Sequence, residues 1–284
     1  MNEDALRLIE AALAEDIGEG DVTSTYFVPE GRQVRGFIIA REDGVLAGVE
    51  LAMEVFRQVD EATDVRPMLG DGARVTQGAH VLEVQGPARS VLTAERTALN
   101  FLQRLSGVAT ATARYVKAVD GTRTRILDTR KTTPGWRLLE KAAVVSGGGT
   151  NHRMGLYDRV MVKDNHLVAE HDLDSLQAAI RKVKAEKPGV EVELEADRLE
   201  QVEGFLSLEG VDHILLDNMT RAELLKAVEL RGDRSFPKLE ASGGVNLETV
   251  AAIAETGVDF ISVGAITHSV KALDLGLDFV PLSE

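Results

Sequence analysis

The chain has 284 residues, a formal net charge of −14 and no cysteine. The acidic balance argues against nucleic acids and anionic membranes as partners, because their phosphates attract cations. The lack of cysteine excludes disulfides, thiolate nucleophiles and cysteine-ligated zinc. A hydrophobic share of 44% predicts a sizeable core, and the length suits one barrel plus a smaller domain.

The first segment, residues 1–16, is acidic and amphipathic and predicts a short helix. It has neither the basic start nor the apolar stretch of a signal peptide. The uncharged apolar runs of the chain are far shorter than the ~20 residues that a membrane-spanning helix needs. We therefore expect a cytoplasmic protein.

Residues 1–115 predict a smaller α/β domain. Apolar or alternating stretches at 34–40 and 81–84 indicate strands, and residues 90–119 show the three- and four-residue apolar steps of a helix. Ser106-Gly107 predicts a break into two helices. Arg96 falls nearly opposite the apolar stripe and so should point away from the core that its own helix contacts.

Residues 116–284 alternate short β-branched strands with helices, although a last helix could return to the first domain. Such alternation predicts parallel strands with right-handed crossovers. We expect an open or incomplete α/β barrel, with a doubly wound sheet as the alternative. Thr133-Pro134 resembles a helix start, and the glycines at 147–149 should end that helix. The predicted strands are 125–129, 160–163, 190–195, 213–217, 238–242 and 260–264, and predicted helices include 174–185, 220–230 and 247–255.

Polar residues follow each of these strands, where α/β barrels place their active sites. The segment 123–166 holds nine Lys or Arg against four acids, a local excess that an anionic ligand would explain. Guanidinium groups bind carboxylates and phosphates in bidentate fashion. Some of these cations fit a solvated face equally well, but Arg130-Lys131 directly follow a strand and fit it poorly.

The last strands end in glycine, at Ser242-Gly243-Gly244 and at Gly264, which precedes His268 by one helical turn. Barrels often bind phosphate with backbone N–H groups after their last two strands, next to a helix N-terminus. Glu193 and Asp217 lie on middle strands. Paired carboxylates there could bind Mg²⁺ or ribose hydroxyls, or act as acid and base.

Several blocks of the chain closely resemble the quinolinate phosphoribosyltransferases, also called nicotinate-nucleotide pyrophosphorylases (carboxylating). The most specific are DTRKTTPGWRLLEKAAVVSGGGTNHRMGLYD at 128–158 and VMVKDNH at 160–166. The resemblance continues through EASGGV at 240–245 and DFISVGAITHS at 259–269, and EDIGEGDVTS at 15–24 matches as well.

The resemblance implies an α/β N-terminal domain, an open barrel, and a homodimer or larger oligomer in which Arg96 reaches the neighbouring subunit's site. It also implies a role for each matching residue. The segment at 192–199 looks longer than the family pattern by one or two residues, which leaves Glu193 and Glu195 as alternatives. The implied quinolinate ligands are Arg130, His152 and Arg153 with Arg96; the implied cations near substrate and pyrophosphate are Lys131 and Lys163; the implied ribose and Mg²⁺ acids are Glu193 and Asp217; and the implied 5-phosphate site is Ser242, Gly243, Gly264 and His268.

By this resemblance the chain transfers phosphoribosyl from phosphoribosyl pyrophosphate (PRPP) to quinolinate with Mg²⁺, releasing CO₂ and pyrophosphate and making nicotinate mononucleotide for NAD biosynthesis. Three alternatives stay open from the sequence. They are a paralogue associated with molybdate transport, a barrel lyase or isomerase acting on a phosphorylated sugar, and a non-catalytic binder of anionic metabolites.

Overall fold

The computed structural model describes residues 1–163 and 172–281, which form two compact units. The first unit comprises 1–113, 133–148 and 269–284, and the second comprises 114–132 and 149–268. The division at 115–116 expected from the sequence gives two contiguous pieces, whereas the compact units are discontinuous. The last helix, 265–268, lies in the second unit, and the element that returns to the first unit is a strand, 275–280.

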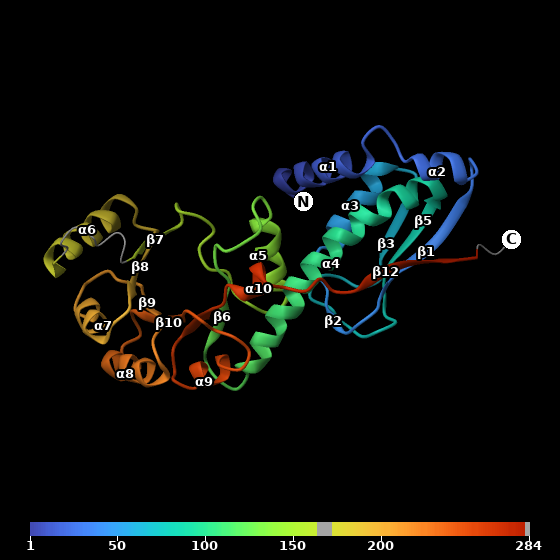
Figure 1. Ribbon diagram of the computed structural model, residues 1–284. Helices are drawn as coiled ribbons and strands as arrows, with labels where there is room; N and C mark the ends of the chain where they lie inside the picture. The colour runs from blue at the N-terminus through green and yellow to red at the C-terminus, as the bar shows by residue number, and fades with distance from the viewer. Residues whose placement is uncertain (164–171, 282–284) are drawn as a thin grey trace. The chain divides into compact units, whose positions relative to one another are not determined.

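The first unit is built on a four-stranded sheet in the order β12-β1-β5-β3. Its last strand in the chain, β12, pairs antiparallel with β1, from Arg35 opposite Val280 to Ala40 opposite Leu275. A two-stranded pair, β2 and β4, accompanies it. The elements of this unit, shown in Figure 1, are α1 (Glu3–Ile17), α2 (Val22–Phe27), β1 (Gln33–Ala40), β2 (Gly44–Val45), α3 (Val49–Val59), β3 (Asp64–Pro67), β4 (Arg74–Val75), β5 (His80–Pro87), α5 (Arg137–Ser146), β12 (Leu275–Val280) and most of α4 (Ala88–Ala118).

The apolar stripe predicted along α4 is buried, and Arg96 is exposed as its place on the helix predicts. The predicted break at Ser106-Gly107 is wrong, because α4 is continuous through it. A Cβ atom at Gly107 would overlap the carbonyl oxygen of Lys271, so the glycine allows a close backbone approach. The Ser106 hydroxyl accepts the Ala47 N–H at 3.1 Å.

The helix start predicted at Thr133-Pro134 is also wrong. The helix α5 begins at Arg137, and Thr133 instead binds a buried carboxylate of that helix. The backbone N–H of Thr133 donates to Oε2 of Glu140 at 3.1 Å, and its hydroxyl donates to Oε1 at 2.8 Å. The Arg104 guanidinium donates to the same Oε1 at 2.8 Å. The predicted end is confirmed, since Gly147 caps the helix.

The second unit is a six-stranded parallel sheet in the order β6-β11-β10-β9-β8-β7. Within the described residues, β6 and β7 are its edges, so the barrel is not closed, and Thr150 forms a bridge beside β6. The predicted parallel α/β architecture is confirmed, although α9 is shorter than expected. The elements are β6 (Arg125–Leu127), β7 (Arg159–Val162), α6 (Leu173–Glu186), β8 (Glu191–Ala196), α7 (Leu199–Leu206), β9 (His213–Asp217), α8 (Arg221–Arg231), β10 (Lys238–Ser242), α9 (Val250–Ala254), β11 (Phe260–Ser262) and α10 (Ala265–His268) (Figure 1).

Two aspartates fix the amino ends of the middle strands in the same way. Asp212 accepts the Val192 N–H at 2.7 Å and pairs with Lys184 of α6 at 2.5 Å. Asp259 accepts the Leu239 N–H at 2.9 Å and pairs with Arg231 of α8. Each aspartate thereby ties a helix to the strands beneath it. Among the described residues, no helix has the length and apolar character needed to cross a membrane.

Candidate active site

A cavity of about 490 Å³ lies at the carboxyl ends of the parallel strands in the second unit. Every strand of the sheet contributes to its wall, either directly or through the loop that follows it. The sequence predicted polar residues at these strand ends, and the fold brings them together. The lining residues are Thr129, Arg130, Lys131, His152, Arg153, Met161, Lys163, Glu195, Leu215, Asp217, Asn218, Glu240, Ser242, Gly243, Gly244 and Ser262.

The cavity has a cationic part of its lining, called here the cationic wall, which comprises Arg130, Lys131, Arg153 and Lys163. The Arg153 guanidinium is held in place, since Nη1 donates to the carbonyl of Arg159 at 3.2 Å. Burial, followed by the positive charge of Arg130, lowers the pKa of Arg153. An arginine stays charged at neutral pH nonetheless, so the wall presents neighbouring positive charges to a ligand. Such a wall favours a compact polyanion.

The acids of β8 are divided between the cavity wall and the interior. Glu195 lines the cavity and pairs with Lys163, whereas the Glu193 side chain has no exposed surface. Asp217, at the end of β9, also lines the cavity, and its Oδ2 accepts the side-chain amide of Asn218 at 2.7 Å. Of the two alternatives left open by the sequence, Glu195 is therefore the carboxylate that a ligand can contact.

The last strands bring glycines to the cavity where space is tightest. Gly243 has φ of +93°, and a Cβ there would overlap the side chain of Asn218, which itself has φ of +55°. At Gly264 a Cβ would lie 3.1 Å from side-chain atoms of both His268 and Lys131. The Thr267 hydroxyl donates to the carbonyl of Lys131 at 2.8 Å. Lys131 is thus positioned against the end of β11.

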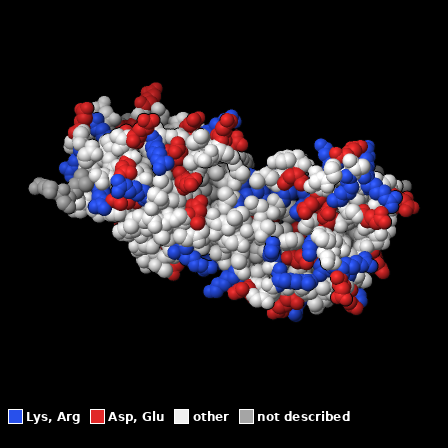
Figure 2. Space-filling model, turned by 180° about the vertical axis from the view of Figure 1, so that it is seen from behind, with Lys and Arg blue, Asp and Glu red and all other residues white. Residues whose placement is uncertain are grey.

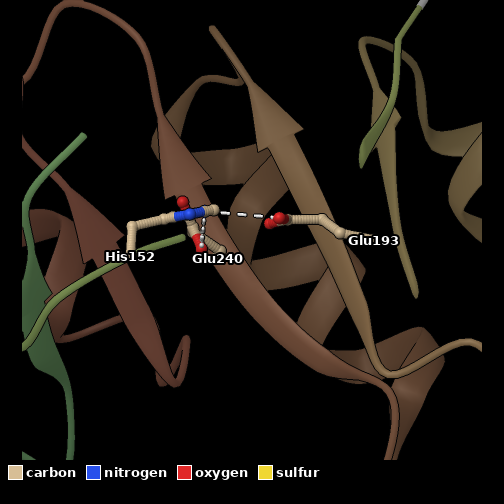
Figure 3. Close-up of side chains that lie close together, drawn as sticks. All are labelled: His152, Glu193 and Glu240. Carbon is tan, nitrogen blue, oxygen red and sulfur yellow. Dashed lines mark ion pairs between the residues drawn. The ribbon is translucent and has the colours of Figure 1, made fainter. Parts of the chain in front are cut away.

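At the cavity wall, the imidazole of His152 lies between the carboxylates of Glu193 and Glu240, both of which are buried (Figure 3). Its Nε2 is 3.3 Å from Oε2 of Glu193 on β8 and 3.4 Å from Oε2 of Glu240 on β10. Its Nδ1 accepts the Arg153 N–H at 2.7 Å. The backbone N–H of His152 donates at 2.7 Å to Asp128, which is also fully buried. His152 is therefore held at three points.

Burial lowers the pKa of His152, but the carboxylates of Glu193 and Glu240 outweigh it and raise the pKa to about 9. The neutral ring fits its contacts if the proton is on Nε2, because Nδ1 then accepts from Arg153. A second proton, on Nδ1, would point at the Arg153 N–H and break this hydrogen bond. Protonation of His152 is therefore coupled to the backbone position of Arg153.

Two family models match the chain. One is described as the C-terminal domain of quinolinate phosphoribosyl transferase and matches residues 108–278; the other is described as the N-terminal domain and matches residues 21–106. The chain belongs to this family.

Relatives of the quinolinate phosphoribosyltransferase family match over nearly the whole chain. The nicotinate-nucleotide pyrophosphorylase [carboxylating] of Mycobacterium leprae is 46% identical, covering 95% of each chain. The chloroplastic enzyme of the same name from Arabidopsis thaliana is 43% identical over 96% of this chain and 82% of its own. The structure of the nicotinate-nucleotide pyrophosphorylase from Francisella tularensis has a TM-score of 0.91 at 40% identity, covering 99% of this chain and 97% of that one.

Not every residue implied by the family resemblance lies at the cavity. Arg96 belongs to the first unit, on α4, where it lines a surface hollow beside Asp16 and Asp21. His268 and Gly264 adjoin Lys131 without lining the cavity themselves. The Asp164-Asn165-His166 segment lies outside the described residues.

Sequence reasoning missed Glu240 and the positioning role of Asp128. A signal for Glu240 was present, since KLEAS places one acid between apolar residues in the middle of a predicted strand. A charged residue is almost never fully buried unless it is paired. The sequence does not show what pairs with it, because His152 lies 88 positions away in the chain.

Proposed function

We propose that this quinolinate phosphoribosyltransferase family member transfers the phosphoribosyl group of PRPP to quinolinate with loss of CO₂. The products are nicotinate mononucleotide and pyrophosphate, intermediates of NAD biosynthesis. The observation that carries the proposal is the cavity, which is lined by four cationic side chains and by the glycines that follow β10. A diacid suits the cations, and a sugar phosphate suits the glycines.

Quinolinate carries two carboxylates on adjacent ring carbons. In the proposed complex, Arg130 and Arg153 bind the carboxylates, with His152 beside them. Bidentate guanidinium contacts fix both the position and the plane of a carboxylate. The fixed side chain of Arg153 supports this role, because an orientation set before binding costs less conformational entropy when the ligand arrives.

PRPP would occupy the opposite part of the cavity. Ser242, Gly243 and Gly264 are proposed to surround the 5-phosphate, with His268 next to them. Gly243 packs against Asn218, and Gly264 packs against His268 and Lys131, so a side chain at either position would displace these groups. Lys131 and Lys163 would then offset the charge that develops on the departing pyrophosphate.

Mg²⁺ would accompany PRPP. The donor set fits this ion, because Asp217 and Glu195 present carboxylate oxygens to the cavity and Mg²⁺ prefers oxygen ligands while retaining water. We propose these two residues for the metal side in place of Glu193, which is buried beneath the wall. When bound, the ion supplies positive charge next to the pyrophosphate.

The proposed reaction needs no protein nucleophile. The lone pair of the quinolinate ring nitrogen forms a bond to the anomeric carbon of the ribose, and the bond from that carbon to pyrophosphate breaks. The ring nitrogen then carries a positive charge. The adjacent carboxylate leaves as CO₂, its bonding pair stays on the ring carbon, and that carbon takes up a proton. Positioning the two substrates contributes up to ~7–11 kcal/mol in favourable cases.

The alternatives are less well supported. The names of the relatives point to quinolinate chemistry rather than to a molybdate-associated paralogue or a phosphosugar isomerase. A non-catalytic binder would not need a cation pair beside the proposed pyrophosphate position. On the face drawn in Figure 2, basic and acidic side chains are intermixed, so that face is not a general basic surface.

We further propose a homodimer or larger homo-oligomer in which Arg96 completes the partner subunit's cavity. The exposure of Arg96 and its place on a different compact unit from the cavity support this proposal. We also propose a cytoplasmic location, in keeping with a chain without cysteine.

Product analysis tests the proposed function. Purified protein is incubated with PRPP, Mg²⁺ and quinolinate, and the amounts of nicotinate mononucleotide, CO₂ and pyrophosphate are measured. The proposal predicts that the three products form in equal amounts. Nicotinate in place of quinolinate is the control and should give no product. Folded wild-type protein that binds quinolinate without turnover would overturn the proposal in favour of the non-catalytic binder.

A further inference from the structure

A cluster of ionisable side chains lies at the cavity wall and directly behind it, formed by His152, Glu193, Glu240 and Arg159. Both glutamates have no exposed surface, and among the described residues their oxygens make ion pairs but no hydrogen bond. Isolated buried carboxylates are strongly unfavourable. Such a cluster persists where its partners and its function compensate for that cost.

The two glutamates have different partners. Glu193 contacts both His152 and Arg159, with Nη1 of the arginine 3.6 Å from its Oε2. Within the part of the chain that the structure describes, His152 is the one basic side chain in contact with Glu240. Glu240 also lines the cavity, and its contact with a basic group runs through His152.

His152 transmits this contact to the cationic wall. Its Nδ1 accepts the N–H of Arg153, the next residue along the chain and a proposed carboxylate ligand. If the imidazole tilts, this hydrogen bond is lost and the start of the Arg153 side chain moves. A misplacement of about 1 Å at a binding residue can change the rate ~100-fold.

We propose that Glu240 is a positioning residue, which holds the imidazole of His152 from beneath and so fixes His152 and Arg153 in the orientation that binds the diacid. The inference rests on the proposed function for its kinetic consequence. Its structural part, the orientation of His152 by Glu240, does not depend on turnover.

The same atoms could be taken for a metal site, since ligand atoms of His152, Glu193 and Glu240 lie within 4.8 Å of one another. The charge of Arg159 argues against that interpretation. With a neutral, metal-bound histidine, Arg159 and a divalent cation would carry three positive charges against the two carboxylates, which leaves excess positive charge in the cluster. We therefore interpret the contacts of His152 with the two carboxylates as contacts that orient the imidazole.

The test compares Glu240→Gln and Glu240→Leu with Glu191→Gln. Glu191 is on β8 and pairs with Arg159 and His213 but not with His152, so Glu191→Gln is the control for loss of a nearby, half-exposed carboxylate that does not contact His152. We expect the KM for quinolinate to rise about tenfold in Glu240→Leu and less in Glu240→Gln, with the KM for PRPP nearly unchanged. The control should leave both KM values as in the wild type.

Long-range ¹H–¹⁵N NMR of the imidazole separates the inference from the proposed function. The His152 signals are assigned by their loss in His152→Gln. The Nε2 proton should exchange slowly in the wild type and in Glu191→Gln, and rapidly in Glu240→Leu, whether or not the protein turns over quinolinate.

Three results would overturn the inference. They are an unchanged quinolinate KM in folded Glu240→Leu, equal changes in both KM values, and an unchanged His152 spectrum. A stoichiometric metal ion found by elemental analysis in the wild type and lost in Glu240→Gln would also overturn it, in favour of a metal site.

Discussion

The Nε2 atom of His152 lies 3.4 Å from Oε2 of Glu240, and their side chains are 5% and 0% exposed. The relationship joins a proposed substrate ligand to an acid that has no direct role in the proposed chemistry. It also connects the ionisation of the cluster to the stability of the fold, because a group whose pKa differs between folded and unfolded states makes stability depend on pH.

The stability of the protein should fall as pH rises from about 6.5 to about 9. The pKa of His152 is raised from 6.5 to about 9 in the folded state, so its contribution is complete below pH 6.5 and is lost above the folded pKa. The contribution is at most about 3 kcal/mol. Thermal unfolding across this range measures it, and Glu240→Gln should flatten the dependence.

A second buried histidine does not interfere with that measurement. Burial, followed by the charge of Arg159, lowers the pKa of His213. A lowered histidine pKa reduces stability as pH falls below the unfolded value of 6.5, on the other side of neutrality. An identical slope above pH 6.5 in the wild type and in Glu240→Gln would contradict the assignment to His152.

Gly243→Ala should impair PRPP binding far more than Gly244→Ala. Both glycines have positive φ, +93° and +61°, so both variants carry the backbone strain of an alanine there. A Cβ at Gly244 meets nothing within 4 Å, whereas at Gly243 it would lie 2.9 Å from the backbone nitrogen of Asn218 and overlap its side chain. The KM for PRPP separates the variants, and equal values would show that strain alone matters.

The sequence predicted the parallel sheet well because each strand is a short β-branched run followed by polar residues. The prediction from sequence failed where a helix is shaped by contacts with residues far away in the chain. Gly107 predicts a helix break by itself, and only the position of Lys271 shows that it serves a close contact. Thr133 has the features of a helix cap, but its N–H and its hydroxyl both donate hydrogen bonds to the carboxylate of Glu140.

The candidate site shows the same division. Residues beyond strand ends, such as Arg130 and Asp217, can be located from the chain order because parallel strands bring their carboxyl ends to one edge. The choice between Glu193 and Glu195 could not be made in this way, since alternate residues of a strand share a face. The structure separates them by burial, because Glu193 has no exposed surface and Glu195 lines the cavity.

Glu140→Ala should destabilise the first unit by about 3 kcal/mol, the scale for breaking one side of a buried ion pair. Glu140 is fully buried and accepts hydrogen bonds from Arg104 and Thr133. Glu140→Gln should cost less because the amide oxygen still accepts. Denaturant unfolding measures the difference, with Glu10→Ala on the exposed face of α1 as a control that should change little. Equal midpoints for Glu140→Ala and Glu10→Ala would contradict the role of the pair.

Mixing two inactive variants should restore activity if Arg96 acts across subunits. Arg96→Ala lacks the residue given to the partner, and Arg130→Ala lacks a residue of its own cavity. In a mixed dimer the Arg96→Ala chain keeps Arg130 and receives Arg96 from its partner, so one of the two cavities is complete. Random mixing of dimers should therefore give about one quarter of wild-type activity.

Each variant alone should stay inactive in the same assay, which shows that recovery comes from the mixture. If Arg96 served its own chain, every cavity would lack one residue, and the mixture would be as inactive as its components. Subunit exchange is checked separately by mass spectrometry of the intact oligomers, so that absent activity in a fully exchanged sample counts against the cross-subunit role.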